Sequence, residues 1–265
     1  MRKLLIVFIA LAVLCTGVYA QTPAVTSGGI SNAANGLTPV TPGALVSIYG
    51  SNLASDLAVS DTIPLSTTLN GVSVTFNGVQ APLLFVSGGQ INAQLPWNVL
   101  SSGTAGTANV VVTNAGKPST SFPVTVGPFS PGIFAINNMA VAINPDGSVA
   151  APAGAIPGIN THPAKAGDPG GLVILCTGLG AVTPPVANGN NANDGVLHTA
   201  TTMPTVLLGG SMPAPVAFAG LSPQFVGVNQ INIAVPANAP TGNAVSLQIQ
   251  VGGATSAANV TIAIQ

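Results

Sequence analysis

One strand-like segment occurs twice in the chain. Residues 90–96 read Gln-Ile-Asn-Ala-Gln-Leu-Pro, and residues 230–236 read Gln-Ile-Asn-Ile-Ala-Val-Pro. Both copies alternate polar and apolar residues and then end at a proline. This pattern is typical of a half-buried β-strand that stops at a residue unable to continue it. The repeat therefore predicts two copies of one β-domain.

The first twenty residues are expected to lie outside this fold. Arg2 and Lys3 precede an apolar run over residues 4–14, and small residues lead up to Ala20. This order predicts a secretory signal peptide over residues 1–20. The run is too short to span a bilayer, which takes about 20 residues, so stable membrane insertion is not expected. The predicted location is secreted, extracellular or at the cell surface, with the periplasm as an alternative.

Charged side chains are scarce along the whole chain. They make up 3% of the residues, whereas an ordinary domain has about 25%. Lys117 and Lys165 are the cations beyond residue 20. Two cations cannot form a basic face, which argues against nucleic acid as a partner. Cys176 is the one cysteine beyond residue 20, so an intramolecular disulfide is not expected and a hydrophobic core must stabilise the fold.

Short alternating segments separated by turns predict an all-β fold. Residues 72–76 alternate and are followed by Asn77-Gly78, a strong signal for a hairpin turn because both positions favour positive φ. We expect residues 79–86 to form the return strand, interrupted by Pro82. The predicted fold class is two tandem immunoglobulin-like β-sandwiches. The expected boundaries are a lead segment over 21–38, a first sandwich over 39–128 and a second over 129–265, which includes a connecting β-hairpin over 129–150.

The order of motifs resembles a known group of domains. Gly50-Ser51-Asn52-Leu53 precedes Val72 to Pro82, and Gln90 to Pro96 follows. This succession resembles the IPT/TIG group of immunoglobulin-like domains. With Ser130-Pro131-Gly132-Ile133-Phe134 and the later repeat, it most closely resembles the Solibacter-type uncharacterised C-terminal domain family of secreted bacterial proteins. The resemblance covers about residues 32–265 and implies the sandwich fold, an extracellular setting and no catalytic motif.

The reactive residue types do not form a recognisable site in the sequence. Cys176 aligns with the end of a core strand and is interpreted as a small buried hydrophobic residue. His162 and His198 are expected in loops, with no spacing typical of zinc ligands. We therefore predict no catalytic residue, no cofactor and no metal site. The Asn-rich segment 188–195 is interpreted as a solvated hairpin loop, and cation binding through its carbonyl groups remains an alternative.

Trp97 is the candidate residue for a contact between the domains or with a ligand, because the second copy of the repeat has no tryptophan at the equivalent position. It follows the first repeat directly, whereas Ala237 occupies the equivalent position in the second. We expect Trp97 to pack between the domains with Phe129 and Phe134, or else to act as an exposed platform for a ligand.

Two functions are consistent with these features. The first is a non-enzymatic interaction, adhesion or structural surface module whose partner is a protein or a surface polymer. Self-association is possible, through outward polar rows (Gln90, Asn92 and Gln94; Ser246, Gln248 and Gln250). The alternative is carbohydrate binding, or less plausibly hydrolysis, at a cleft that gathers Trp97 with Asp or Asn side chains.

Overall fold

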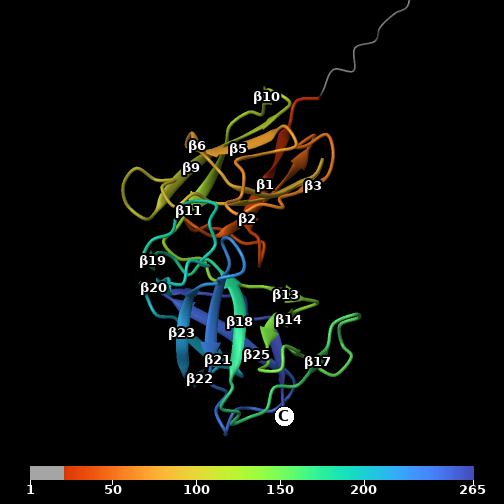
Figure 1. Cartoon of the computed structure of the whole chain (residues 1–265), viewed down its shortest axis with the longest axis vertical. Coiled ribbons are helices and arrows are strands. Elements are labelled where there is room, and N and C mark those ends of the chain that lie inside the picture. Colours follow the sequence, from red (N-terminus) through yellow and green to blue (C-terminus); the bar gives the residue numbers. More distant parts are fainter. Residues whose placement is uncertain (1–20) are drawn as a thin grey trace, which may run out of the picture.

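The chain is all-β. The computed structural model describes residues 21–265, and all 27 regular elements in this range are strands (Figure 1). The predicted signal peptide lies outside the described residues. Within them, no helix is long and apolar enough to cross a membrane.

Two sheets form the first sandwich. The five-stranded sheet has the order β1 (Ala24–Asn32), β2 (Leu45–Ser51), β8 (Gln90–Gln94), β7 (Leu83–Val86) and β3 (Ala58–Val59). The six-stranded sheet has the order β10 (Lys117–Pro118), β9 (Gly106–Asn114), β5 (Val72–Phe76) and β4 (Thr68–Leu69), with β11 (Phe122–Val126) on β9 and β6 (Val79–Gln80) on β5.

Two larger sheets form the second sandwich. The nine-stranded sheet has the order β17 (Thr161–His162), β16 (Val149–Ala150), β15 (Ala142–Ile143), β18 (Leu172–Thr177), β24 (Asn229–Ile233), β23 (Val216–Leu221), β20 (Thr199–Ala200) and β19 (Val182–Thr183), with β12 (Gly132–Ile133) on β18. The seven-stranded sheet has the order β13 (Ala135–Ile136), β14 (Met139–Ala140), β27 (Thr261–Ile264), β25 (Gly242–Val251), β21 (Thr205–Leu208) and β22 (Met212–Ala214), with β26 (Ala254–Thr255) on β25.

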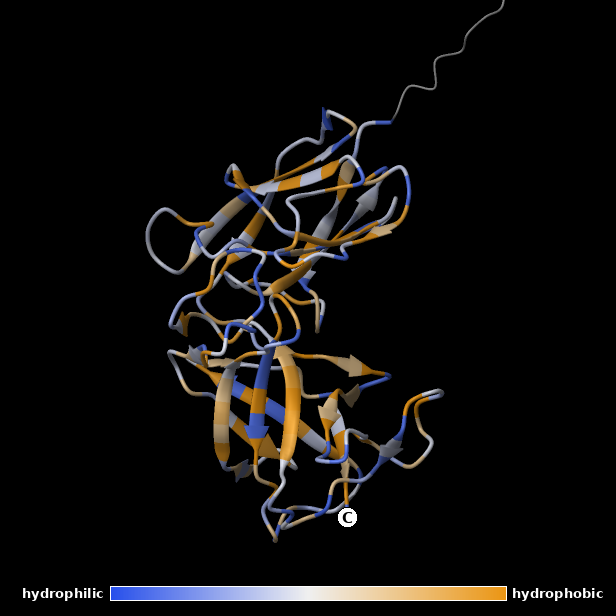
Figure 2. Cartoon of the chain, viewed as in Figure 1, coloured by the Kyte–Doolittle hydropathy of each residue, from blue (hydrophilic) through white to orange (hydrophobic). Residues whose placement is uncertain are grey.

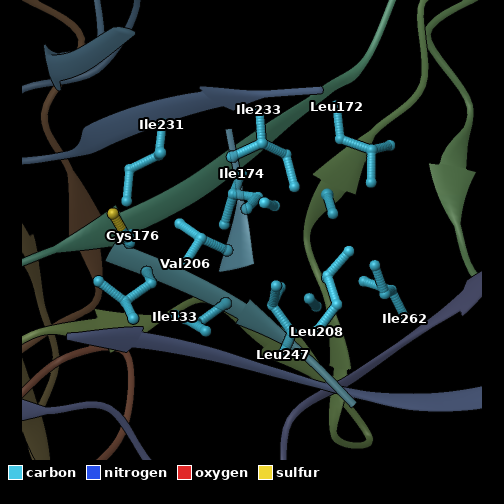
Figure 3. Packing of buried hydrophobic residues seen from close by; sticks show 14 of the residues in the cluster. Ile133, Leu172, Ile174, Cys176, Val206, Leu208, Ile231, Ile233, Leu247 and Ile262 are labelled. Atoms are coloured by element: carbon cyan, nitrogen blue, oxygen red, sulfur yellow. The ribbon is translucent and has the colours of Figure 1, made fainter. Parts of the chain in front are cut away.

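Each sandwich has its own hydrophobic core. One buried cluster draws its side chains from residues 30–126, and the other draws them from residues 133–264. Figure 2 shows the hydrophobic stretches along the strands of both bodies. Figure 3 shows the second core, in which the thiol of Cys176 lies among aliphatic side chains such as Ile231 and Val206. Cys176 is fully buried, as the sequence predicts.

The repeated segment forms equivalent strands in the two sandwiches. Ile91 of β8 pairs with Ile48 of β2, and Ile231 of β24 pairs with Ile174 of β18. All four isoleucines are fully buried. The alternation in the repeat thus places its isoleucines in the two cores, as predicted.

The Asn77-Gly78 turn is confirmed, but the return strand differs from the prediction. Asn77 has φ 49° and Gly78 has φ 80°, and β5 pairs antiparallel with β6 across them. The chain then leaves this sheet at Ala81-Pro82, and β7 joins the other sheet beside β8. Proline has no N–H to continue the ladder, which explains why residues 79–86 form two short strands in different sheets.

Two further expectations need correction. Residues 21–38 are more than a lead, because β1 within them pairs with β2 as part of the first sandwich. The polar rows on β8 and β25 do not offer edges for self-association, since both strands lie inside their sheets with partners on each side. Gln94 does not face solvent either, because only 1% of it is exposed.

Candidate functional site at the junction of the two sandwiches

A loop of the second sandwich docks onto the first. The backbone N–H of Leu65 donates to the carbonyl of Gly189 at 2.8 Å. Gly189 N–H donates to Gln94 Oε1 at 2.7 Å. Trp97 N–H donates to Asn188 Oδ1 at 2.8 Å, and Asn188 Nδ2 donates to Asn98 Oδ1 at 3.0 Å. The start of the Asn-rich segment 188–195 is therefore a docking loop and not the solvated hairpin that we expected.

Buried polar groups close the other side of the junction. Asn32 Nδ2 donates to the carbonyl of Ser130 at 2.7 Å. Leu45 N–H donates to Thr177 Oγ1 at 3.0 Å, and this hydroxyl donates to the carbonyl of Gly227 at 2.7 Å. Thr177 is fully buried and Asn32 is 1% exposed. Buried polar groups are costly unless paired, so these bonds hold the two sandwiches in one arrangement.

Trp97 packs across the same junction. Its ring is half-buried against a small cluster from the second sandwich that includes Val182, Ala192 and Leu221. On the other side the ring covers Gly43, where an added Cβ would lie 2.1 Å from a ring carbon. A cavity of about 120 Å³ beside the ring has no Asp or Asn side chain in its lining. The surroundings of Trp97 thus suit packing between the sandwiches better than the saccharide cleft considered from the sequence.

Of the three aromatic residues that the sequence grouped together, the structure brings Trp97 and Phe129 to the same turn and leaves Phe134 apart. The ring of Phe129 packs against the second core and lies over Gly180 and Gly252. Gly180 also lines the cavity beside Trp97, so these two aromatic rings flank one glycine turn. Phe134 is half-buried and belongs to none of the described clusters.

An apolar groove that the sequence did not predict lies at this junction. It encloses about 260 Å³ and is lined by Leu45, residues 60–63, Leu65 and Leu84 from the first sandwich and by residues 224–226 and Val228 from the second. Ile63 is 50% exposed and Phe225 is 49% exposed. The lining residues are far apart in the sequence, so only their exposed apolar side chains could have been noticed beforehand.

An apolar edge strand runs into the groove. β3 is the last strand of its sheet and continues directly into Ser60, which lines the groove. Leu57 is 68% exposed and Val59 is 59% exposed. Ser60 N–H donates inward to the carbonyl of Leu84 at 2.9 Å. Inward and outward groups alternate along a strand, so the N–H and C=O of Val59 point away from β7 and are free to pair.

Each of the two histidines is paired with an aspartate and a backbone carbonyl. His162 Nδ1 donates to the carbonyl of Pro163 at 2.8 Å, and its Nε2 donates to Asp146 Oδ2 at 2.9 Å. His198 donates in the same way, to the carbonyl of Pro184 at 2.7 Å and to the Asp194 carboxylate at 3.1 Å. Both partners of each ring can only accept hydrogen bonds, so each ring satisfies them as an imidazolium.

These contacts shift the pKa values of both pairs. The Asp146 bond raises the pKa of His162, and the Pro184 carbonyl followed by Asp194 raises that of His198. The pKa of Asp146 is lowered by Ser148 and then by His162, and that of Asp194 by the Val196 N–H and then by His198. His198 lies in the loop before β20, as expected, although it is only 3% exposed; His162 instead ends the short strand β17.

The remaining reactive groups are also occupied or buried. Desolvation raises the pKa of the Cys176 thiol, which keeps it protonated. Among residues 21–265, no group of three or more His, Cys or Asp side chains could hold a metal ion. Both nitrogens of each histidine are bonded to acceptors of the protein itself.

The first sandwich has a counterpart among known domain families. Residues 36–126 match the family model of the IPT/TIG domain. This IPT/TIG match spans β2 to β11 and accounts for less than half of the chain. It supports the expectation of an immunoglobulin-like domain, while the Solibacter-type resemblance stays a prediction.

Comparison with whole proteins adds a distant similarity. The chain is similar to a solved structure of FdeC, described as a broadly conserved Escherichia coli adhesin, at 13% sequence identity and a TM-score of 0.25. The alignment covers 92% of this chain and 63% of the FdeC chain. No curated protein matches the chain.

Proposed function

We propose that this chain is a non-enzymatic immunoglobulin-like interaction module that works outside the cytoplasm. The IPT/TIG match of the first sandwich and the predicted leader over residues 1–20 support this assignment. The occupied histidines and the buried thiol leave little chemistry to perform. Recognition by surfaces is therefore the function that the structure supports best.

The junction groove carries the proposal. It is apolar, open to solvent and built by residues from both sandwiches. Exposed apolar surface that continues into a groove is typical of an interaction site. β3 adds an unpaired strand edge beside it. The two features together suit an extended segment of a partner protein, which would pair with Val59 and place an apolar side chain in the groove.

Peptide display tests this function. We expect the protein to select 12-residue peptides that alternate apolar and polar residues from a random library. Binding of these peptides is lost when Ile63→Asp and Phe225→Asp are combined, because a carboxylate has to be desolvated in the groove. Val59→Pro removes the outward N–H and lowers the affinity for the same peptides.

A matched control is available on another face. Met203 is 51% exposed and outside the groove, so Met203→Asp introduces one carboxylate at the same exposure as either single groove substitution and leaves peptide binding unchanged. If the wild type and the double groove variant select the same peptides, the proposal is contradicted.

A further inference from the structure

A second surface feature is duplicated along with the cores. In the first sandwich, Gln90 Nε2 donates to Asn92 Oδ1 at 2.8 Å, and Asn92 lies opposite Phe85 across the strand pair. In the second sandwich, Gln230 Nε2 donates to Asn232 Oδ1 at 3.1 Å, and Asn232 lies opposite Phe218. We call each set of three residues an amide–Phe triad.

The position of the phenylalanine is also repeated. In both sandwiches the register of the strand pair shifts one residue before the phenylalanine, between Leu83 and Phe85 and between Val216 and Phe218. A β-bulge of this kind redirects a side chain. The same irregularity therefore turns the ring toward the amide pair in both copies.

Core packing does not require these residues. The triad members are all half-buried on the outer face, and they alternate with buried residues such as Ile91 and Ile231. In Figure 2, β24 is the mostly hydrophilic strand between the hydrophobic β18 and β23. Loops have diverged between the copies, whereas this outward arrangement is present in both.

The triad of the second sandwich lines a cavity of about 230 Å³. The ring of Phe218 lies over Gly220, whose added Cβ would be 2.7 Å from the ring. Gly220 is the cross-strand neighbour of Gln230. Because the glycine has no side chain, the ring can lie along the sheet beside the two amides.

A braced loop forms the other wall of this cavity. Asp194 Oδ1 accepts hydrogen bonds from Val196 N–H at 3.0 Å and from His198 Nε2 at 3.1 Å. These bonds hold Val196 and Leu197 over the cavity, although Leu197 is 72% exposed. A wall fixed before binding lowers the entropy lost when a ligand is bound.

The free groups of the triad define the chemistry of a ligand. Within residues 21–265, no hydrogen bond is made by Gln230 Oε1 or Asn232 Nδ2, so the pair offers a free acceptor oxygen and free amide N–H groups next to an aromatic ring. Neighbouring hydroxyl groups need this combination of donors and acceptors, and the C–H face of a sugar ring can stack on phenylalanine. Neither Lys117 nor Lys165 lines the cavity. The ring of His198 does, but its two nitrogens are bonded to the Pro184 carbonyl and to Asp194, so the cavity lining offers no unpaired cation to an acidic ligand.

We propose that the Phe218, Gln230 and Asn232 triad binds one sugar unit of an uncharged polysaccharide. The cavity is smaller than the roughly 300–1,000 Å³ typical of sites for drug-sized molecules, which suits a single unit of a longer chain. The Phe85, Gln90 and Asn92 triad is a second copy, bordered by Tyr49 opposite Gln90. Two sites on one chain raise the avidity for a repetitive polymer. This activity goes beyond the peptide recognition proposed above and uses different residues.

Affinity electrophoresis tests the proposal with four uncharged polysaccharides, namely laminarin, xylan, galactomannan and hydroxyethyl cellulose. We expect at least one of them to retard the mature protein. Replacing both amides, Gln230→Ala with Asn232→Ala, weakens that association at least tenfold. Phe218→Leu weakens it by a similar factor because stacking is lost.

Two controls separate binding from folding. Gln248→Ala removes an equally half-buried amide on β25 of the other sheet and keeps full binding. Circular dichroism and thermal melts verify that the triad variants are folded. Trp97 fluorescence gives an independent titration, since Trp97 packs on Ala192 and Leu221, which also line the cavity.

The possible outcomes are distinct. Retardation that the amide replacements do not change, retardation by anionic alginate alone, or no retardation by any of the four polysaccharides overturns the proposal. The combined groove variant Ile63→Asp and Phe225→Asp retains polysaccharide binding, so failure of the peptide proposal does not affect this one.

Discussion

Gly43 shows how one missing side chain permits the junction. Its φ is 82°, a conformation that costs other residues about 1–2 kcal/mol, and the ring of Trp97 occupies the space of a Cβ. Gly43→Ala therefore combines backbone strain with overpacking and should lower the free energy of unfolding by about 3 kcal/mol. Gly78 has φ 80° with open space around it, so Gly78→Ala should cost about 1 kcal/mol. Urea denaturation followed by circular dichroism measures both. Equal losses contradict the role assigned to the Trp97 contact.

The two histidine–aspartate pairs predict a stability optimum in mild acid. The raised pKa values of His162 and His198 mean that their stabilisation is complete below the unfolded value of about 6.5 and is lost as the pH rises through the folded values. The pKa values of Asp146 and Asp194 are lowered, so the stabilisation by these two aspartates is present above about pH 3.9 and is lost as the pH falls through their folded values. The melting temperature should therefore be highest between about pH 4 and 6.5. Melting curves of the double variant His162→Asn and His198→Asn should show no decline above pH 6.5; a decline like that of the wild type contradicts this origin.

At the scale of elements, each sandwich has a serine at an equivalent position that closes a hairpin. In the second, Ile249 N–H donates to Ser256 Oγ at 2.9 Å and Ser256 N–H donates back to the Ile249 carbonyl at 2.9 Å. In the first, Val112 and Ser119 make the same two bonds at 3.0 and 2.7 Å. Each hydroxyl thus satisfies a backbone N–H at the point where a long strand loses its neighbour.

Removing either hydroxyl should leave a buried N–H without a partner. Ser256→Ala and Ser119→Ala are each expected to lower the free energy of unfolding by about 1–3 kcal/mol. Ser211→Ala, in the exposed turn between β21 and β22, is the matched control and should change it by less than about 0.5 kcal/mol. Chemical denaturation distinguishes these values. If Ser256→Ala matched the control, water rather than Ser256 Oγ would satisfy the Ile249 N–H.

Patterns among neighbouring residues predicted the strands and turns well. The wrong or missing predictions involve contacts between residues that are far apart in the sequence. The Asn77-Gly78 turn depends on two adjacent residues and is confirmed by their φ values. Gln94 follows the same alternation as Gln90, but Gly189 covers it from the other sandwich. No periodicity in the sequence carries information about that contact. The groove and the amide–Phe triads were missed for the same reason, since each joins residues from separate strands or loops.

For the whole molecule, the central question is whether the sandwiches unfold together. They share no strand and have separate cores, so each could in principle unfold alone. The bonds across the junction oppose this, because separation exposes polar groups that are satisfied only when the two bodies are docked. Gln94 is the clearest case, with Nε2 donating to the Gly43 carbonyl at 3.3 Å and Oε1 accepting from Gly189 at 2.7 Å.

Gln94→Leu tests this coupling. Leucine has a similar size but leaves the Gly43 carbonyl and the Gly189 N–H unpaired in a buried site, at a cost of about 1–3 kcal/mol for each group. Calorimetry of the wild type should show one transition with equal calorimetric and van't Hoff enthalpies, and the variant should show two. Gln80→Leu, at an exposed position on β6, keeps the single transition. A single unchanged transition in Gln94→Leu would mean that the apolar contact of Trp97 holds the junction without the amide. In that case Gly43→Ala, which displaces the ring, is the variant that splits the transition.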